Sequence, residues 1–226
     1  MAKSSDGEKT MKAVLFDMDG LIFDTESLYK KSWQRAAKEQ GFDLCDEFYQ
    51  GFIGVQDGEC ERRLQHHFGA EFDLQRFIRC RDQDFTERST QGIDYKKGFE
   101  TLMRHLKQNG VRAAIVTSSG RKEVLRNFAD REVLEQFECL ITSDEVSQGK
   151  PAPDGYLMAC QQLNLKPSQC LALEDSNNGV KSALAAGCSV IMVPDLLPPE
   201  PPLIEKVTLV DSLTEVIALI PTTTPC

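Results

Sequence analysis

Long apolar runs are missing from this 226-residue sequence. It has no stretch of about eighteen consecutive apolar residues, the length that a helix needs to span a bilayer. Residues 1–10 are polar and lack the apolar middle of a secretory signal. We therefore expect no membrane partner and a cytoplasmic location.

Clustered cysteines are missing as well. The eight cysteines are scattered, and no two have the Cys-x-x-Cys spacing of a zinc or redox site. Several, such as Cys139, Cys170 and Cys188, fall inside apolar patterns that are typical of buried positions. Without a secretory signal, we expect reduced thiols rather than a disulfide framework.

Positive charge is scarce: 26 lysines and arginines stand against 35 aspartates and glutamates, for a net charge of −9. A nucleic-acid-binding protein would be expected to carry a basic stripe, so we expect no nucleic-acid partner. Residues 25–93 are also acidic overall, which argues against a basic clamp there. An anionic substrate would therefore need local positive charge.

What the sequence does contain is a pair of aspartates directly after an apolar run. Residues 13–16 read as a buried strand, and Asp17 and Asp19 follow it with Gly20 closing the turn. Residues two apart on an extended strand share a face, so the two carboxylates can converge and repel unless a cation intervenes. This favours a metal site that handles phosphate. An aspartate-rich turn closed by glycine is the alternative.

Three further polar segments follow in a consistent order, at 116–119, 149–154 and 173–179. The first and last come directly after expected strands, and the middle one precedes an expected helix. Because ligands bind at the carboxyl ends of strands in an open α/β sheet, we expect these segments to gather at one edge.

The residue types suit phosphoryl transfer. Asp17 would attack phosphorus, which requires a metal to screen two approaching anions. Asp19 would protonate the leaving oxygen and then deprotonate the attacking water. Glu174 and Asp175 add oxygen ligands of the hard kind that prefers Mg²⁺, although they could instead cap the helix that begins near Asn177.

Donors and positive charge come from two other segments. Thr117 and Ser118 can donate hydroxyl and backbone N–H bonds to phosphate oxygens, or either could simply be a helix N-cap. Lys150 lies just before a proline-rich turn and would supply positive charge to the nucleophile and the phosphoryl group. The alternative for Lys150 is a solvated loop lysine.

In this order the four segments resemble the haloacid dehalogenase superfamily of hydrolases, in particular members with a helical cap of the β-phosphoglucomutase and pseudouridine-5′-phosphatase-like group. The resemblance runs from about residue 11 to about residue 219. It implies a Mg²⁺ site formed by Asp17, the carbonyl of Asp19 and Asp175, with Glu174 the less certain ligand, since it could act through a water. It also implies that Gly20, Ser118 and Asn178 bind phosphate or substrate.

From residue 94 onward, expected strands and helices alternate, which predicts an α/β fold with a doubly wound, parallel, Rossmann-like sheet. Residues 25–93 show only helical patterns broken by glycines, which predicts a cap of about four helices. We therefore expect a catalytic core at 1–24 and 94–226 and a cap at 25–93. The expected strands are 13–16, 111–116, 139–142, 170–173, 189–193 and 208–210, and the expected core helices are 97–108, 122–128, 156–163, 179–186 and 211–219.

The leading hypothesis is a Mg²⁺-dependent phosphatase of a small phosphorylated metabolite, acting as a monomer or weak dimer. The alternatives are a β-phosphoglucomutase-like mutase and a non-catalytic phosphate sensor. A mutase must grip a second phosphate in its cap, where this sequence has Ile53 and Asp57, although Arg62 and Arg63 follow. A dehalogenase does not require an acid two residues after its nucleophile, because halide leaves without protonation. The presence of Asp19 therefore favours phosphoryl chemistry over dehalogenation.

Residues of the cap would set specificity by closing over the core. Candidates are Asp57, Arg62, His66 and His67, of which the adjacent histidines are better explained as one exposed and one packed side chain. A phosphonate hydrolase would need a cap lysine as a Schiff base, but Lys30 and Lys31 read as solvated.

Overall fold

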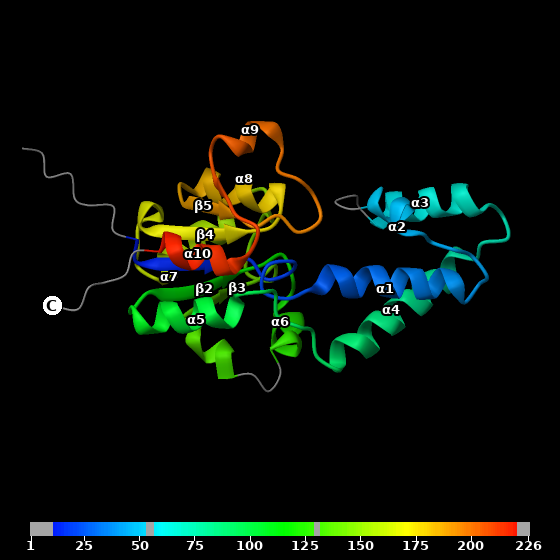
Figure 1. Cartoon of the computed structure of the whole chain (residues 1–226), viewed down its shortest axis with the longest axis horizontal. Coiled ribbons are helices and arrows are strands. Elements are labelled where there is room, and N and C mark those ends of the chain that lie inside the picture. The colour runs from blue at the N-terminus through cyan, green and yellow to red at the C-terminus, as the bar shows by residue number, and fades with distance from the viewer. Residues whose placement is uncertain (1–10, 53–56, 129–131, 221–226) are drawn as a thin grey trace, which may run out of the picture. The chain divides into compact units, whose positions relative to one another are not determined.

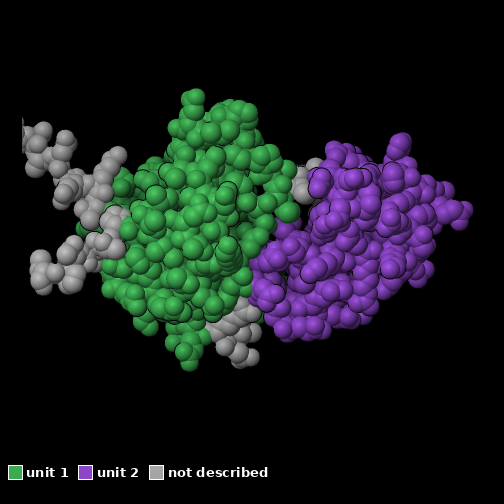
Figure 2. All heavy atoms as spheres, viewed as in Figure 1, with its two compact units in different colours: residues 1–22, 95–226 green, residues 23–94 purple. Residues whose placement is uncertain are grey.

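The computed structural model describes residues 11–52, 57–128 and 132–220. It divides into two compact units, residues 1–22 with 95–226 and residues 23–94 (Figure 2). The boundaries expected from the sequence, after residues 24 and 93, differ from these by two residues and one residue.

Unit 1 is built on a six-stranded sheet in which every pair of neighbouring strands is parallel (Figure 1). Its order is β3-β2-β1-β4-β5-β6, so the direction of winding reverses between β1 and β4. Ligands bind at such a switch point, outside the carboxyl ends of the strands. The strands are β1 (Ala13–Phe16), β2 (Arg112–Val116), β3 (Cys139–Ile141), β4 (Cys170–Glu174), β5 (Ser189–Met192) and β6 (Thr208–Leu209).

Helices pack on both faces of this sheet, so the expected doubly wound α/β fold is confirmed. α7 (Asp154–Gln162) packs on β2 and β3, and α8 (Asn177–Ala186) packs on β4 and β5. On the other face, α5 (Phe99–Gln108) packs on β2 and also contacts α10 (Leu213–Leu219). α6 (Arg121–Asn127) follows β2 in the chain.

The central strand β1 is buried on both of its faces. Leu15 belongs to the cluster that contains Tyr156 and Ala159 of α7. The next residue, Phe16, points the opposite way and makes edge-to-face contacts with Phe99 and Phe137 at ring-centroid distances of 6.1 and 5.7 Å. Because both faces are covered, the strand is continuously apolar, as parallel sheets require.

Unit 2 contains four helices within the described residues: α1 (Thr25–Lys38), α2 (Asp46–Gln50), α3 (Asp57–Phe68) and α4 (Leu74–Thr90). Trp33 lies at its centre, with the rings of Tyr49, Phe52 and Phe77 at centroid distances of 5.9, 5.6 and 5.3 Å. The guanidinium of the buried Arg81 lies 5.2 Å from the Trp33 ring centroid. Unit 2 therefore has a hydrophobic core of its own.

The structure differs from the expected elements in several details. The ends of the expected core elements shift by one or two residues, and Cys139 is half-buried rather than buried, whereas Cys170 and Cys188 are buried. Residues 198–202 include four prolines, a composition from which we expect a stiff surface loop, but Pro201 and Pro202 begin the short helix α9 (Pro201–Ile204). Proline suits the first turn of a helix because the N–H that it lacks has no partner there.

Two short 3₁₀ helices were not expected either, η1 (Glu132–Gln136) and η2 (Pro167–Gln169). Neither segment is long enough to show the apolar periodicity by which a helix is predicted from sequence. Among the described residues, no helix is both long and apolar enough to cross a membrane. The seven described cysteines are all free thiols.

Candidate functional site: a carboxylate cluster at the sheet switch point

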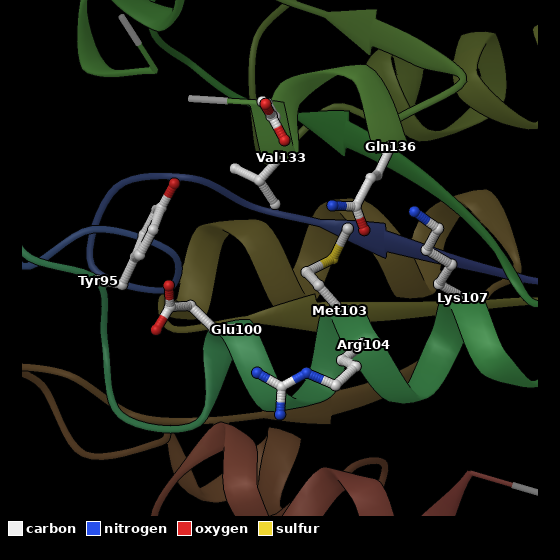
Figure 3. Close-up of a pocket in the computed structure, with 8 residues that line it drawn as sticks. Tyr95, Glu100, Met103, Arg104, Lys107, Val133 and Gln136 are labelled. Carbon is white, nitrogen blue, oxygen red and sulfur yellow. The ribbon is translucent and has the colours of Figure 1, made fainter. Parts of the chain in front are cut away.

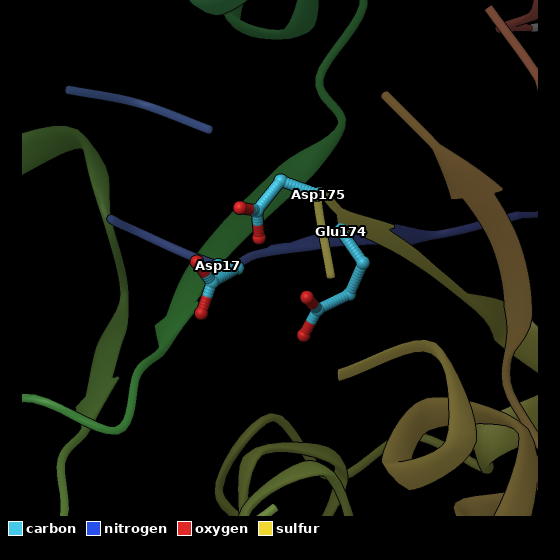
Figure 4. A group of neighbouring side chains, drawn as sticks. All are labelled: Asp17, Glu174 and Asp175. Carbon is cyan, nitrogen blue, oxygen red and sulfur yellow. The ribbon is translucent and has the colours of Figure 1, made fainter. Parts of the chain in front are cut away.

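Three carboxylates meet where β1 and β4 end (Figure 4). Asp17 directly follows β1, and its N–H donates to the carbonyl of Leu173 at 3.0 Å, which extends the ladder between these strands. Glu174 is the last residue of β4, and Asp175 follows it. One oxygen from each of these three carboxylates lies within 4.8 Å of the others. Two segments that are far apart in the sequence thus build one acidic cluster.

The Lys150 ammonium group lies inside this cluster. It donates to Glu174 Oε1 at 2.6 Å, to the carbonyl of Val116 at 2.9 Å and to Asp17 Oδ1. Burial disfavours its charge, but Asp17 and Glu174 outweigh burial and raise the pKa of Lys150 above its usual value. The solvated lysine is therefore excluded, and the cluster carries a fixed positive charge.

Burial also acts on the two carboxylates of β4. It raises the pKa of the fully buried Glu174 to about 7, against the lowering effect of Lys150. For Asp175, burial and the nearby charge of Asp17 raise the pKa well above its usual value. Carboxylates in this state gain from a bound cation, which would restore their charged forms.

Two residues that the sequence analysis did not single out shape the position of Glu174. The hydroxyl of Tyr156, fully buried on α7, donates to Glu174 Oε1. A Cβ at Gly179 of α8 would lie 1.9 Å from Glu174 Oε2, so only glycine leaves room for this carboxylate. Tyr156 lies at an apolar position of its helix, so the sequence predicts only that it is a core residue and does not predict its contact with Glu174.

Asp19 is held by Ser119, which the sequence analysis included in the polar segment 116–119 without giving it a role. The hydroxyl of Ser119 donates to Asp19 Oδ2 at 2.6 Å. Loss of solvation raises the pKa of Asp19 to about 6; the hydrogen bond from Ser119 lowers it and the charge of Asp17 raises it. Of the two residues named from the sequence, Thr117 is buried and its Oγ1 accepts from the Ser119 N–H at 3.0 Å, whereas Ser118 is exposed.

Gly20 follows Asp19 in a left-handed conformation with φ of 79°. A Cβ there would lie 2.4 Å from Asp175 Oδ2, so glycine is required both by the turn and by the close approach. Asn178 is exposed in the first turn of α8. Its neighbour Asn177 instead binds the proline-rich segment, donating to the carbonyl of Pro198 at 3.2 Å.

The four cap candidates all belong to α3 of unit 2, whereas Lys30 and Lys31 lie on α1. Arg62 pairs with Glu59 at 2.7 Å, and His66 and His67 are both exposed, so the expectation that one histidine is packed holds only for the His67 ring, which stacks on Phe48 at 4.0 Å. Arg63 also pairs with Glu59, at 2.9 Å, Lys30 pairs with Asp46 at 2.7 Å, and Lys31 is exposed. Ile53 and the side chain of Asp57 lie outside the described part of the structure.

A separate cavity of about 550 Å³ lies along α5 and η1 (Figure 3). Two acidic and two basic side chains line it, so its charge is balanced and it offers an anionic substrate no net attraction. None of the clustered carboxylates lines it. The lining residues are Tyr95, Glu100, Met103, Arg104, Lys107, Glu132, Val133 and Gln136.

The carboxylate cluster fits a hard divalent cation. Three carboxylates offer oxygen atoms close enough to share one ion, and oxygen ligands select hard cations over soft ones. The buried ammonium group of Lys150 beside them and the hydroxyl group of Thr117, which directly follows β2, can receive an anion. Together these groups can bind a phosphate ester next to a carboxylate nucleophile.

Comparison with known proteins supports this interpretation. Residues 14–193 match the family of haloacid dehalogenase-like hydrolases. A probable pseudouridine-5′-phosphatase of Drosophila melanogaster is 36% identical over 187 residues, 80% of each chain. Hexitol phosphatase A of Escherichia coli is 36% identical over 203 residues, covering 88% of this chain and 89% of the relative.

A solved structure shows the same architecture. A hydrolase of this family from Deinococcus radiodurans, crystallised with bound phosphate and sodium, superposes with a TM-score of 0.81 at 26% identity. The superposition covers 96% of this chain and all of the other. The structural similarity therefore extends beyond residues 14–193, the region that matches the family.

The space beside Gly179 gives a test of the cluster. We expect Gly179→Ala to displace Glu174, because the added methyl group cannot share its position, and to weaken binding of a divalent cation about tenfold or more. Isothermal titration calorimetry with Mg²⁺ measures this. The matched control is Gly58→Ala on α3, where a Cβ meets nothing within 4 Å. Equal affinity in both variants would contradict the role given to Glu174.

Proposed function

This chain belongs to the haloacid dehalogenase-like hydrolases, and from that premise we propose that it is a Mg²⁺-dependent phosphatase of a small phosphorylated metabolite. The observation that carries the proposal is the contact of Lys150 with both Asp17 and Glu174 at the sheet switch point. A buried lysine between carboxylates balances their charge and provides attraction for an incoming phosphate. Phosphatases among the similar proteins support the reaction type.

In the first half of the reaction, a carboxylate oxygen of Asp17 attacks phosphorus. The bond from phosphorus to Asp17 forms as the bond to the ester oxygen breaks, which gives an aspartyl-phosphate. Lys150 and the Thr117 hydroxyl stabilise the charge that builds on the phosphoryl oxygens, with Ser118, Gly20 and Asn178 as further contacts to phosphate or substrate. The burial of Thr117 supports a fixed position for its hydroxyl.

In both halves of the reaction, Asp19 moves the proton. It first gives a proton to the leaving oxygen, and it then takes one from the water that attacks the aspartyl-phosphate. A carboxyl group whose pKa is raised to about 6 suits both roles, since it can hold a proton and release it near neutral pH. Phosphate leaves and Asp17 is regenerated.

The proposed cofactor is Mg²⁺, held by Asp17, the backbone carbonyl of Asp19 and Asp175, with Glu174 acting directly or through a water. When bound, it would neutralise phosphate oxygens so that two anions can approach each other. The clustered oxygens of Asp17, Glu174 and Asp175 support this ligand set. The D. radiodurans relative was crystallised with both phosphate and sodium bound, which supports the proposal of a protein that holds an anion and a cation.

The substrate class is a phosphosugar, nucleotide or polyol phosphate. The similar proteins named for pseudouridine 5′-phosphate and hexitol phosphates support this range. The cap, proposed here as residues 25–93, would set the choice within it. The proposal includes a monomer or weak dimer in the cytoplasm, without nucleic-acid or membrane partners; the free thiols of the described cysteines are consistent with a reducing compartment.

We expect Asp17→Asn to remove turnover while the fold is kept, since an amide cannot attack phosphorus. The kcat for p-nitrophenyl phosphate should fall more than about a hundredfold, a loss of about 2.7 kcal/mol or more in transition-state stabilisation. Circular dichroism checks the fold. Asp43→Asn, at an exposed position outside the cluster, is the matched control and should keep full activity. An active, folded Asp17→Asn enzyme would mean that another group is the nucleophile.

The metal proposal predicts that EDTA abolishes phosphate release and that Mg²⁺ restores it. Ca²⁺ should restore it poorly, because it is larger, takes six to eight ligands and would draw Asp17 away from in-line geometry. Initial rates after dialysis into each metal measure the effect. Full activity in metal-free buffer would be incompatible with this cofactor.

A third measurement separates a phosphatase from a mutase. With β-glucose 1-phosphate as substrate, we expect release of inorganic phosphate that needs no bisphosphate activator, because the negatively charged Asp57 and apolar Ile53 suit a second phosphate poorly. Coupled assays for inorganic phosphate and glucose 6-phosphate follow both products. Rapid formation of glucose 6-phosphate that glucose 1,6-bisphosphate stimulates, with little free phosphate, would identify a mutase.

A further inference from the structure

We infer that Ser119 is a positioning residue that orients the Asp19 carboxyl for proton transfer to the leaving group. This inference rests on the proposed phosphatase function. The observation is the hydrogen bond from Ser119 Oγ to Asp19 Oδ2 at 2.6 Å, which joins the segment after β2 to the segment after β1. The two residues are a hundred positions apart in the sequence, so the contact depends on the fold.

The main chain of Ser119 is fixed on both sides. Its N–H donates to Thr117 Oγ1 at 3.0 Å, and its carbonyl accepts from the N–H of Ser143 at 3.1 Å, in the loop after β3. The next residue, Gly120, is the N-cap of α6. A hydroxyl on such a fixed segment has little freedom, so it can hold a carboxyl group in one orientation.

This hydrogen bond makes the two oxygens of Asp19 unequal. Oδ2 accepts from Ser119, so Oδ1 is the oxygen left to pass a proton to the ester oxygen. As the bond between phosphorus and that oxygen breaks, its electron pair takes the proton from Oδ1, and Asp19 becomes a carboxylate that still accepts from Ser119. Ser119 also links Asp19 to Thr117, because its N–H donates to the Thr117 hydroxyl oxygen. Thr117 is the proposed hydrogen-bond donor to the phosphate.

A role in positioning the acid has a signature that a structural or phosphate-binding role lacks. Protonation matters most when the leaving group is a poor one, whereas p-nitrophenolate leaves as a stable anion. Phenyl phosphate and p-nitrophenyl phosphate have the same phosphoryl group and the same ring, and differ in the nitro group that stabilises the leaving anion. The steps that determine kcat/KM end with departure of the alcohol, so later hydrolysis of the aspartyl-phosphate does not affect it.

The experiment measures kcat/KM for both esters with wild type and Ser119→Ala. We expect a loss of about thirtyfold for phenyl phosphate and less than about threefold for p-nitrophenyl phosphate, so their ratio changes about tenfold. Ser119→Thr, which keeps the hydroxyl, should restore most of the loss. Ser168→Ala is the matched control, at an exposed serine in η2 that contacts neither Ser119 nor the carboxylate cluster, and should leave both values unchanged.

Equal losses for the two esters, or no loss for either, would overturn the role of Ser119. If Ser119→Ala does not fold, Ser119→Cys replaces it, since a thiol of similar size is a weak donor and should give the same selective loss. A folded wild type that hydrolyses neither ester with Mg²⁺ present would overturn the proposed function and this inference with it. A wild type that is active on both, with equal losses in the variant, overturns the inference alone.

Discussion

The structure of the site depends on one electrostatic arrangement, the insertion of Lys150 among buried carboxylates. Two like unit charges about 4 Å apart repel by about 4 kcal/mol at an effective dielectric constant of 20. Three carboxylates gathered within 4.8 Å would therefore take up protons or separate if no cation were present. Lys150 removes much of that cost before any metal or substrate binds.

The fold brings these charges together because the sheet changes direction between β1 and β4. A strand end on each side of the switch point contributes acidic groups. The neighbouring strand β2 contributes the carbonyl of Val116, which Lys150 also contacts, and Thr117 directly follows that strand. Tyr156 and Gly179, on helices of the same face, then fix Glu174 within the cluster. Lys150 therefore reduces the electrostatic cost of the cluster, whereas Tyr156 and Gly179 determine the position of the Glu174 side chain.

Much of this arrangement could be predicted from sequence, and the part that could not has a physical reason. Asp17 and Asp19 follow a short apolar run and precede a turn residue, Gly20, and this combination is typical of the end of a buried strand. Ser119 and Tyr156 gave no comparable signal, because their roles come from hydrogen bonds between segments far apart in the chain. The helix at Pro201 was missed because proline is read first as a loop residue, although it also suits a helix start.

The order of the strands also bears on how the protein is made. β1 is synthesised before both of its partners in the sheet, which are β2, after the whole of unit 2, and β4, near residue 170. Pairings this distant in sequence close large loops and form slowly. Unit 2, which has its own aromatic core, can fold before the strands that pair with β1 have been synthesised. A nascent chain that ends before residue 175 therefore carries Asp17, the proposed nucleophile, but lacks the complete carboxylate cluster.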